Sequence, residues 1–139
     1  MAETSAAVIY FSLEGNTRHL AELIADAAEC QLIEVKPKPG EERRETLRHI
    51  WGSTQVHLPE EPALDPIEED LHRFDLLFIG TPVWAGSVAP PIRTFLEEQE
   101  FFRCNFALFA SYSGRTGRIF RELRRRLSGN EILGEIGVR

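Results

Sequence analysis

The sequence predicts an α/β fold, in which a parallel sheet of five strands carries helices on both of its faces. Short apolar runs alternate along the chain with segments in which apolar residues recur at helical spacing. This β-α-β-α-β-α-β-α-β order is typical of a parallel sheet, because parallel strands need a long crossover between them. The chain of 139 residues has the length of one domain, so we expect a single domain over residues 1–139.

The expected strands are short runs that end in polar or glycine residues. They cover residues 6–12, 31–37, 74–80, 104–111 and 131–138. The runs at 6–12 (AAVIYFS) and 74–80 (FDLLFIG) are nearly continuous apolar stretches, as in strands buried on both faces.

The expected helices lie between these strands. In residues 16–29 one apolar face is formed by Leu20, Leu23, Ile24 and Ala27. Pro90 and Pro91 suit the first turn of a helix that continues through Ile92, Phe95 and Leu96. The last helix is expected over residues 116–127, with Ile119, Phe120, Leu123 and Leu127 on one side.

The middle of the chain is expected to hold one more helix and a long irregular stretch. Residues 41–51 are expected to be helical, with Leu47, Ile50 and Trp51 turned inward. Residues 52–66 contain three prolines and are expected to be irregular.

Composition and charge exclude several classes of protein. No apolar run approaches the roughly 20 residues of a membrane span, and the first residues lack the basic region of a signal peptide. Cys30 and Cys104 are 74 positions apart, without a CxxC motif, which fits a reducing cytoplasm and argues against a zinc site. The net charge of −6 disfavours nucleic acid as a partner. Residues 115–126 nevertheless carry six arginines and one glutamate, which indicates a solvated helix face, a site for the phosphate of a pyridine nucleotide, or a docking surface for an acidic partner.

Three of the expected strands are followed by loops rich in small, hydroxylated or aromatic residues. Because the carboxyl ends of parallel strands meet at one edge of a sheet, these loops are expected to form one ligand site. The first loop is Ser12, Leu13, Glu14, Gly15, Asn16 and Thr17. The second is Thr81, Pro82, Val83, Trp84, Ala85 and Gly86. The third is Ser111, Tyr112, Ser113 and Gly114.

The chemistry of these loops suits a ligand with a phosphate at one end and a flat ring at the other. The first loop leads into a helix, whose unpaired N–H groups and positive dipole end attract a phosphate. Trp84 and Tyr112 offer aromatic surfaces on which a planar heterocycle can stack. Each loop alone is equally compatible with a plain helix cap or turn. Together they describe a site for flavin mononucleotide (FMN).

The motifs YFSLEGNTR (10–18), FIGTPVWAG (78–86) and FASYSGRTG (109–117) resemble those of the flavodoxin-like FMN-binding proteins. The resemblance implies a flavodoxin-like three-layer αβα sandwich with strand order 2-1-3-4-5 and non-covalent FMN. It places the first loop around the phosphate, the second along the isoalloxazine and the third beside the ring. Trp84 and Tyr112 are the candidates for stacking.

The sequence departs from the flavodoxin pattern in two places. Many flavodoxins have threonine at the position of Glu14, so one hydroxyl donor is lost and the Glu14 side chain must turn away from the phosphate. The helix that usually follows the fifth strand is also missing, which predicts an uncovered apolar patch on one sheet face. A second copy of the chain or a shifted helix is expected to fill this gap.

The resemblance implies a cytoplasmic electron carrier that works between a reductase and an acceptor protein. An NAD(P)H-dependent FMN quinone or nitro reductase of the same fold is the alternative, and a flavin-free interaction module is a weaker one. No catalytic residue and no metal ligand is predicted, and the four histidines are interpreted as structural or solvated. The chain lacks the GK[ST] and GxGxxG motifs, and also the acidic cluster of response regulators.

Overall fold

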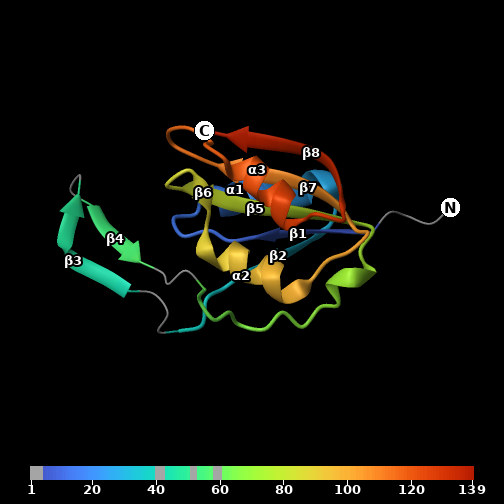
Figure 1. Cartoon of the computed structure of the whole chain (residues 1–139), viewed down its shortest axis with the longest axis horizontal. Coiled ribbons are helices and arrows are strands. Elements are labelled where there is room, and N and C mark those ends of the chain that lie inside the picture. The colour runs from blue at the N-terminus through green and yellow to red at the C-terminus, as the bar shows by residue number, and fades with distance from the viewer. Residues whose placement is uncertain (1–4, 40–42, 51–52, 58–60) are drawn as a thin grey trace.

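Five strands lie side by side in a parallel sheet, in the order β2-β1-β5-β7-β8. The computed structural model describes residues 5–39, 43–50, 53–57 and 61–139, and the side chains of residues 5–39 and 61–139 (Figure 1). The sheet strands are β1 (Ala6–Tyr10), β2 (Gln31–Glu34), β5 (Leu76–Trp84), β7 (Asn105–Ser111) and β8 (Glu131–Val138). Numbered along the chain, these five strands have the order 2-1-3-4-5, which confirms the prediction.

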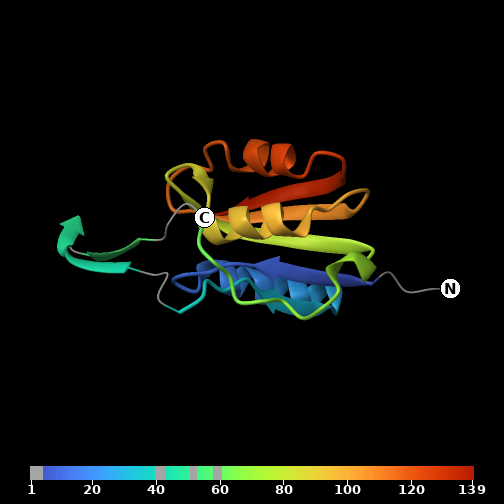
Figure 2. The same cartoon turned by 60° about the horizontal axis from the view of Figure 1, so that its bottom comes forward.

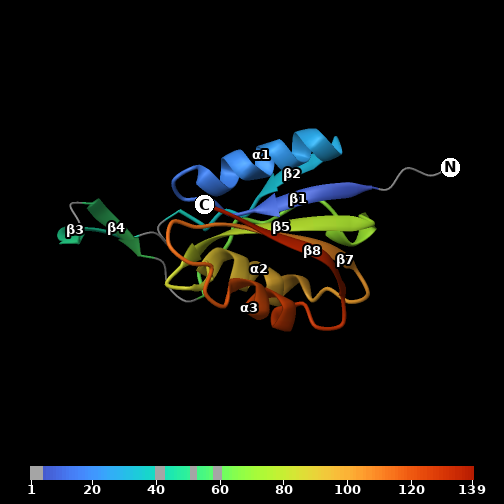
Figure 3. The same cartoon turned by 90° about the horizontal axis from the view of Figure 1, so that it is seen from above.

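The helices form the outer layers of the predicted αβα sandwich. Figure 3 shows α1 (Asn16–Ala28) on one face of the sheet, and α2 (Pro90–Gln99) with α3 (Ile119–Arg126) on the other. A short 3-10 helix, η1 (Leu71–Arg73), precedes β5. No helix in the described part of the chain is long and apolar enough to cross a membrane.

Two apolar clusters hold the layers together. The larger cluster lies between the sheet and the α2/α3 layer, and the smaller one contains Val8, Tyr10, Ala21, Ala25 and Phe109 beneath α1. Neighbouring residues of β1 belong to different clusters because successive side chains of a strand point to opposite faces.

The face that α1 turns to the sheet differs from the prediction. Thr17, Ala21 and Ala25 are the buried residues of this helix, whereas Leu23 and Ala27 are exposed. Small side chains at spacings of four let the helix backbone lie close to the sheet, so the longer side chains flank the contact line instead of filling it.

The predicted helix over residues 41–51 is wrong. Residues Arg43–Ile50 form strand β3, which pairs antiparallel with β4 (Ser53–His57) in a separate two-stranded sheet. β4 also contradicts part of the irregular stretch expected at 52–66. β-Branched residues such as Ile50 and Val56 favour extended backbone, and the apolar spacing fits a helix for only about one turn. The inward positions expected of Leu47, Ile50 and Trp51 lie outside the side chains that the structure describes.

The β3–β4 hairpin stands apart from the main sheet in Figures 1 and 2. The chain returns from it past a single bridge between Pro37 and Leu64, and residue 65 donates its N–H to the carbonyl of Lys36 at 2.8 Å. The hairpin therefore adds nothing to the order of the five-stranded sheet.

β5 is longer than expected, because Thr81–Trp84 continue the strand. The chain then turns at Ala85 and Gly86, both with positive φ, and returns as β6 (Ser87–Val88), antiparallel to β5. Of the three predicted loops, the second is therefore the end of strand β5 followed by a two-residue hairpin turn.

One sheet face is left partly open beside β8. Ile136 pairs with Phe109 and Val138 with Ser111, so both side chains point to the face that carries α1. Ile136 and Val138 are exposed, as is Leu133 in the same strand.

Candidate functional site

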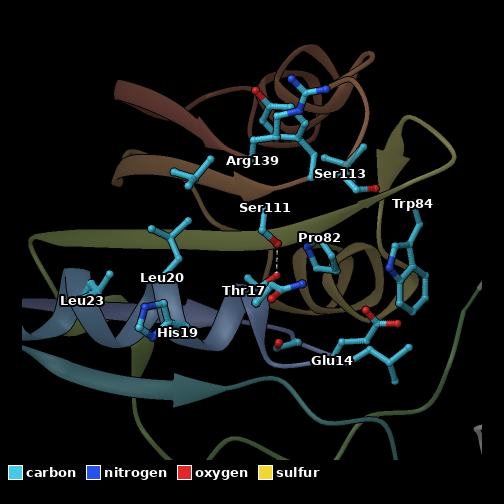
Figure 4. Close-up of a pocket in the computed structure, with 16 residues that line it drawn as sticks. Glu14, Thr17, His19, Leu20, Leu23, Pro82, Trp84, Ser111, Ser113 and Arg139 are labelled. Atoms are coloured by element: carbon cyan, nitrogen blue, oxygen red, sulfur yellow. Dashed lines mark hydrogen bonds between the residues drawn. The ribbon is translucent and has the colours of Figure 1, made fainter.

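The carboxyl ends of β1, β5 and β7 surround a cavity of about 700 Å³ (Figure 4). A cavity of this size is within the range that holds cofactor-sized ligands. Its lining comprises Ser12, Leu13, Glu14, Asn16, Thr17, His19, Leu20, Leu23, Pro82, Val83, Trp84, Ser111, Tyr112, Ser113, Val138 and Arg139. Segments of all three predicted loops thus meet at one place.

The amino-terminal end of α1 borders this cavity without a side-chain cap. Gly15 is the N-cap residue and has φ +98°, a backbone conformation that suits glycine. Its N–H donates to the Ser12 hydroxyl at 3.0 Å, and the first helical hydrogen bond runs from His19 N–H to the Gly15 carbonyl at 2.9 Å. The N–H groups of Asn16, Thr17 and Arg18 find no acceptor among the described residues. This end of the helix is therefore free to bind an anion.

Two hydroxyl groups join the first and third loops. Thr17 Oγ1 lies 2.6 Å from Ser111 Oγ, and this hydrogen bond links α1 to the end of β7 (Figure 4). Thr17 is buried and Ser111 half-buried, so the bond is shielded from bulk water on one side. It fixes the position of both hydroxyls at the helix end.

The aromatic part of the cavity comes from the ends of β5 and β7. Trp84 is half-buried and packs edge-on against Phe11, with the ring centroids 5.6 Å apart and the planes at 84°. Its contact with Phe11 fixes the orientation of the indole. Tyr112 donates its N–H to the Val138 carbonyl at 3.0 Å, which attaches the third loop to β8.

Glu14 lines the cavity, but its carboxylate lies on the Trp84 side in Figure 4, away from Thr17. This placement agrees with the expectation that the side chain turns from the end of α1. Among the described residues, no group of His, Cys, Asp or Glu side chains is arranged to hold a metal ion.

Five of the predicted site residues do not line the cavity, namely Gly15, Thr81, Ala85, Gly86 and Gly114. Thr81 is fully buried; its hydroxyl donates to the Pro82 carbonyl at 2.8 Å and accepts from the Ala89 N–H at 3.2 Å. It therefore secures the start of α2 to β5. Ala85 and Gly86 border a second cavity instead.

Five lining residues were not predicted, namely His19, Leu20, Leu23, Val138 and Arg139. His19, Leu20 and Leu23 follow the first turn of α1, so the cavity runs along the helix beyond the loop. Val138 ends β8 at the same sheet edge, and Arg139 follows it. The helical spacing of Leu20 and Leu23 indicated a core position, and it gave no sign that the sheet beneath them is open.

The fold, the cavity at the strand ends and the uncapped helix define a flavodoxin-like protein. Residues 5–132 match the family model described as Flavodoxin, so the chain belongs to the flavodoxin family. A comparison with curated proteins finds no significant match.

Several solved structures are similar to this chain throughout its length. The flavoprotein of Lactobacillus acidophilus NCFM in complex with FMN is 23% identical, with a TM-score of 0.72 and coverage of 97% of this chain and 93% of that one. Its apo-form gives 24% identity, a TM-score of 0.67, and coverage of 100% and 95%. Two-electron reduced Megasphaera elsdenii flavodoxin gives 17% identity, a TM-score of 0.64, and coverage of 96% and 85%. At these identities the likeness concerns the fold.

Proposed function

We propose that the protein binds FMN non-covalently in the cavity at the strand ends and carries electrons between redox partner proteins. One observation carries the proposal: a free helix end with two hydroxyls lies in the same cavity as the indole of Trp84. FMN supplies one- or two-electron chemistry when bound, and the protein sets its binding and orientation.

The residues at the start of α1 fit the phosphate. The three free N–H groups of Asn16, Thr17 and Arg18 supply donors, and the helix dipole favours a negative charge at this end. The hydroxyls of Thr17 and Ser111 are hydrogen-bonded to each other, so one of their two protons is left to donate to the phosphate, and this donor needs no cation. Serines 12 and 113 also face the cavity.

The residues at the other end fit the ring. Trp84 offers a flat apolar surface that its contact with Phe11 holds in place, and Pro82 and Val83 continue the same wall. Tyr112 borders the cavity from β7. The isoalloxazine would lie between the second and third loops.

Absorption spectroscopy of the freshly purified protein tests the FMN site. We expect flavin bands near about 370 and 450 nm from a chromophore that heat releases as FMN, since isoalloxazine chemistry belongs to the cofactor itself. Thr17→Val removes the buried hydroxyl and is expected to weaken FMN binding about tenfold. Thr116→Val, which makes the same change outside the cavity, should leave the affinity unchanged. A colourless protein that takes up no added FMN would overturn the proposal.

Charge supports a carrier with a low reduction potential. Residues 115–126 hold a local charge of +5, which leaves −11 on the rest of the chain. Because a reduced flavin is anionic, surrounding negative charge disfavours its reduction. We expect the second electron to enter at a potential below that of free FMN, as measured by reductive titration. A potential above that of free FMN would contradict this.

Steady-state kinetics separate a carrier from the reductase alternative. If the protein is a carrier, NADPH is oxidised in the presence of a quinone only when a reductase is added. If it is an NAD(P)H-dependent FMN reductase, it oxidises NADPH with the quinone without any added protein. Redox partner proteins and a cytoplasmic location are part of the carrier proposal. The free cysteines, Cys30 and Cys104, suit that reducing environment.

The exposed apolar side chains of β8 also lead us to predict a homodimer. The exposed side chains of Leu133, Ile136 and Val138 are the part of β8 that a second copy would cover. Size-exclusion chromatography with light scattering tests this, and a clean monomer at micromolar concentration would remove it.

A further inference from the structure

A second cavity, of about 710 Å³, lies between the β5–β6 turn and helix α3. Its backbone wall is formed by residues 85–87 and Gly117. All of its charged lining residues come from α2 and from residues 118–126, and they are Arg93, Arg118, Arg121, Arg125, Arg126 and Glu122. Five arginines therefore line one cleft in a chain whose net charge is −6.

Two of these arginines are fixed in place. Arg93 Nε donates to the Val88 carbonyl at 3.1 Å. Arg126 Nε donates to Glu122 at 3.0 Å, and its Nη1 lies 3.4 Å from a carboxylate oxygen of Glu97. Anchored guanidinium groups lose little freedom when a ligand binds, so they favour recognition over a purely solvated role.

The other three arginines have no carboxylate partner among the described residues. Arg118, Arg121 and Arg125 are exposed and occupy one side of the α3 segment at spacings of three and four. Arg124, on the same helix, behaves differently, since its Nε lies 3.2 Å from a Glu135 oxygen. Like charges at these spacings destabilise a helix, so this row of arginines costs stability that an anion would restore.

Glu122 does not neutralise this row. Its Oε1 accepts hydrogen bonds from Ser87 and from the Val88 N–H, and its Oε2 is bonded to Arg126. Both oxygens of the single carboxylate in the cleft are thus occupied.

Two backbone segments, one at Gly86 and one at Gly117, touch each other in the wall of the cleft. A Cβ at Gly117 would lie 2.7 Å from Gly86 Cα, and Arg118 donates its N–H to the Gly86 carbonyl at 3.1 Å. The β5–β6 hairpin forms part of both cavities, since Trp84 lines the first and residues 85–87 line the second.

We propose that this arginine cleft, defined by the six charged residues above, binds the phosphate groups of a nucleotide that carries at least a diphosphate. Guanidinium groups pair with phosphate oxygens through two parallel hydrogen bonds, and several of them are needed for several phosphates. The concave, partly anchored arrangement suits a small polyanion better than the flat surface of an acidic protein. The inference concerns a separate cavity and does not require flavin in the first one.

Isothermal titration calorimetry of the protein as purified tests this proposal, with inorganic pyrophosphate, ADP and NADPH as the probes. We expect saturable binding of all three probes, little binding of adenosine, and weaker binding at about 0.15 M salt than at low salt. Arg121→Ala and Arg125→Ala should each weaken pyrophosphate binding at least about tenfold. Alanine is a good helix former, so α3 should persist in both variants.

Arg124→Ala is the matched control, because it removes the same charge from the same helix on the side that faces Glu135. It should change the affinity less than about twofold, within the range of a screened surface charge. Tighter binding of NADPH than of ADP would identify a dinucleotide as the ligand; equal binding would identify the diphosphate alone.

Three results would overturn the proposal. They are the absence of saturable binding below about 1 mM for every probe, equal losses in Arg121→Ala and Arg124→Ala, and Arg121-dependent binding of poly-glutamate without binding of the nucleotides. The last result would make the cleft a docking surface for an acidic protein. Flavin absorbance, recorded on the same samples, reports the first cavity separately, so failure there cannot be confused with failure here.

Discussion

The Glu122 carboxylate accepts a hydrogen bond from the Ser87 hydroxyl, with 2.5 Å between the two oxygens. The same oxygen accepts the Val88 N–H at 3.1 Å, and the other lies 3.0 Å from Arg126 Nε. One side chain therefore fastens α3 to the short strand β6. Burial acts to raise the pKa of Glu122, but the hydrogen bonds from Ser87, Val88 and Arg126 outweigh it and hold the pKa below its ordinary value of 4.5.

Glu122→Gln should destabilise the protein in a pH-dependent way. A carboxyl group with a lowered pKa stabilises the folded state above its unfolded pKa, and that contribution disappears as the pH falls through the folded-state pKa. Near neutral pH the variant should lose about 1 to 2 kcal/mol of unfolding free energy. Urea denaturation at a series of pH values should show the gap between wild type and variant closing below about pH 4.5.

The control for this prediction is Glu98→Gln, an exposed position on α2 with no hydrogen bond or ion pair among the described residues. It should leave the free energy of unfolding within about 0.5 kcal/mol of wild type. A gap for Glu122→Gln that stays constant down to pH 3 would show that the charge of this carboxyl is irrelevant.

Gly80→Ala should be among the most destabilising small substitutions in the sheet. A Cβ at Gly80 would lie 2.1 Å from the nearest atom of the Phe109 ring, which occupies the space above this glycine. Forcing extra volume into a packed core costs about 1 to 3 kcal/mol, measurable by thermal or chemical denaturation. Gly134→Ala is the matched control in a strand, because no atom lies within 4 Å of its added Cβ.

A double-mutant cycle identifies Phe109 as the cause of this loss. Phe109→Leu shortens the side chain above Gly80, so Gly80→Ala should cost less in that background than in the wild type. If the two losses simply add, the clash with the ring is not what destabilises the variant.

Tyr10 should ionise only at high pH. Burial, the hydrogen bond from its hydroxyl to Glu34 at 3.1 Å and the charge of Glu34 together raise its pKa from 10.0 to about 12. The stability that this group contributes is complete below pH 10 and is lost as the pH rises towards 12. The chain has two tyrosines, so Tyr112→Phe leaves Tyr10 as the only phenol, and the ultraviolet absorbance of the flavin-free protein then follows its titration alone.

Glu34→Gln in the Tyr112→Phe background should lower the pKa of Tyr10 while leaving it above 10.0, because burial is the largest cause of the shift. Circular dichroism at each pH shows that the chain is still folded. A folded protein whose phenol titrates near pH 10 would contradict the environment described for Tyr10.

Thr94→Val should stabilise the protein. The Thr94 hydroxyl oxygen in α2 is buried and has no hydrogen-bond partner in the described structure. Replacing it with a methyl group of similar size removes an unpaired polar atom, which is worth about 1 kcal/mol and a rise in Tm of about 3 °C. Thr81→Val is the opposite case, because the Thr81 hydroxyl makes two hydrogen bonds. Thr81→Val should lower Tm. Equal changes of Tm in the two variants would show that the Thr94 hydroxyl is not an unpaired polar group.

The order of the sheet could be predicted because its strands carry strong local patterns. The runs that form β1 and β5 are apolar for most of their length. Neither run extends into a segment with apolar residues at helical spacing without a break, so each could be recognised as a strand. The rule that parallel strands end at one edge then brought Ser12, Trp84 and Ser111 to one cavity, as the structure places them.

The errors arose where local pattern and tertiary packing disagree. Leu23 has the spacing of a core residue, yet it is exposed because Ala21 and Ala25 make the contact with the sheet. The apolar residues near 47–51 suggest a helix, but the backbone of Arg43–Ile50 finds its hydrogen-bond partner in β4. Pairing between two strands depends on both of them, and a single segment does not encode it.

The row of arginines was visible in the sequence, but its partners were not. Whether a charged side chain is paired depends on distant residues such as Glu135 and Glu97, which a sequence pattern does not place. Arg124 and Arg126 have carboxylate partners, whereas Arg121 and Arg125 have none among the described residues, and these two unpaired side chains line the arginine cleft.

The register of β8 has a consequence for how the protein behaves when it is concentrated. β8 is an edge strand of the sheet, so one side of its backbone could form hydrogen bonds with a strand of another molecule. Its pairing with β7 shifts between Phe106 and Ala107, where Leu133 is an extra residue between the partners Ile132 and Gly134. An extra residue bends and twists a strand, so it breaks the flat template that fibril growth requires. Deleting Leu133 should restore an even ladder and so increase strand-to-strand association at this edge, which light scattering at rising protein concentration would detect.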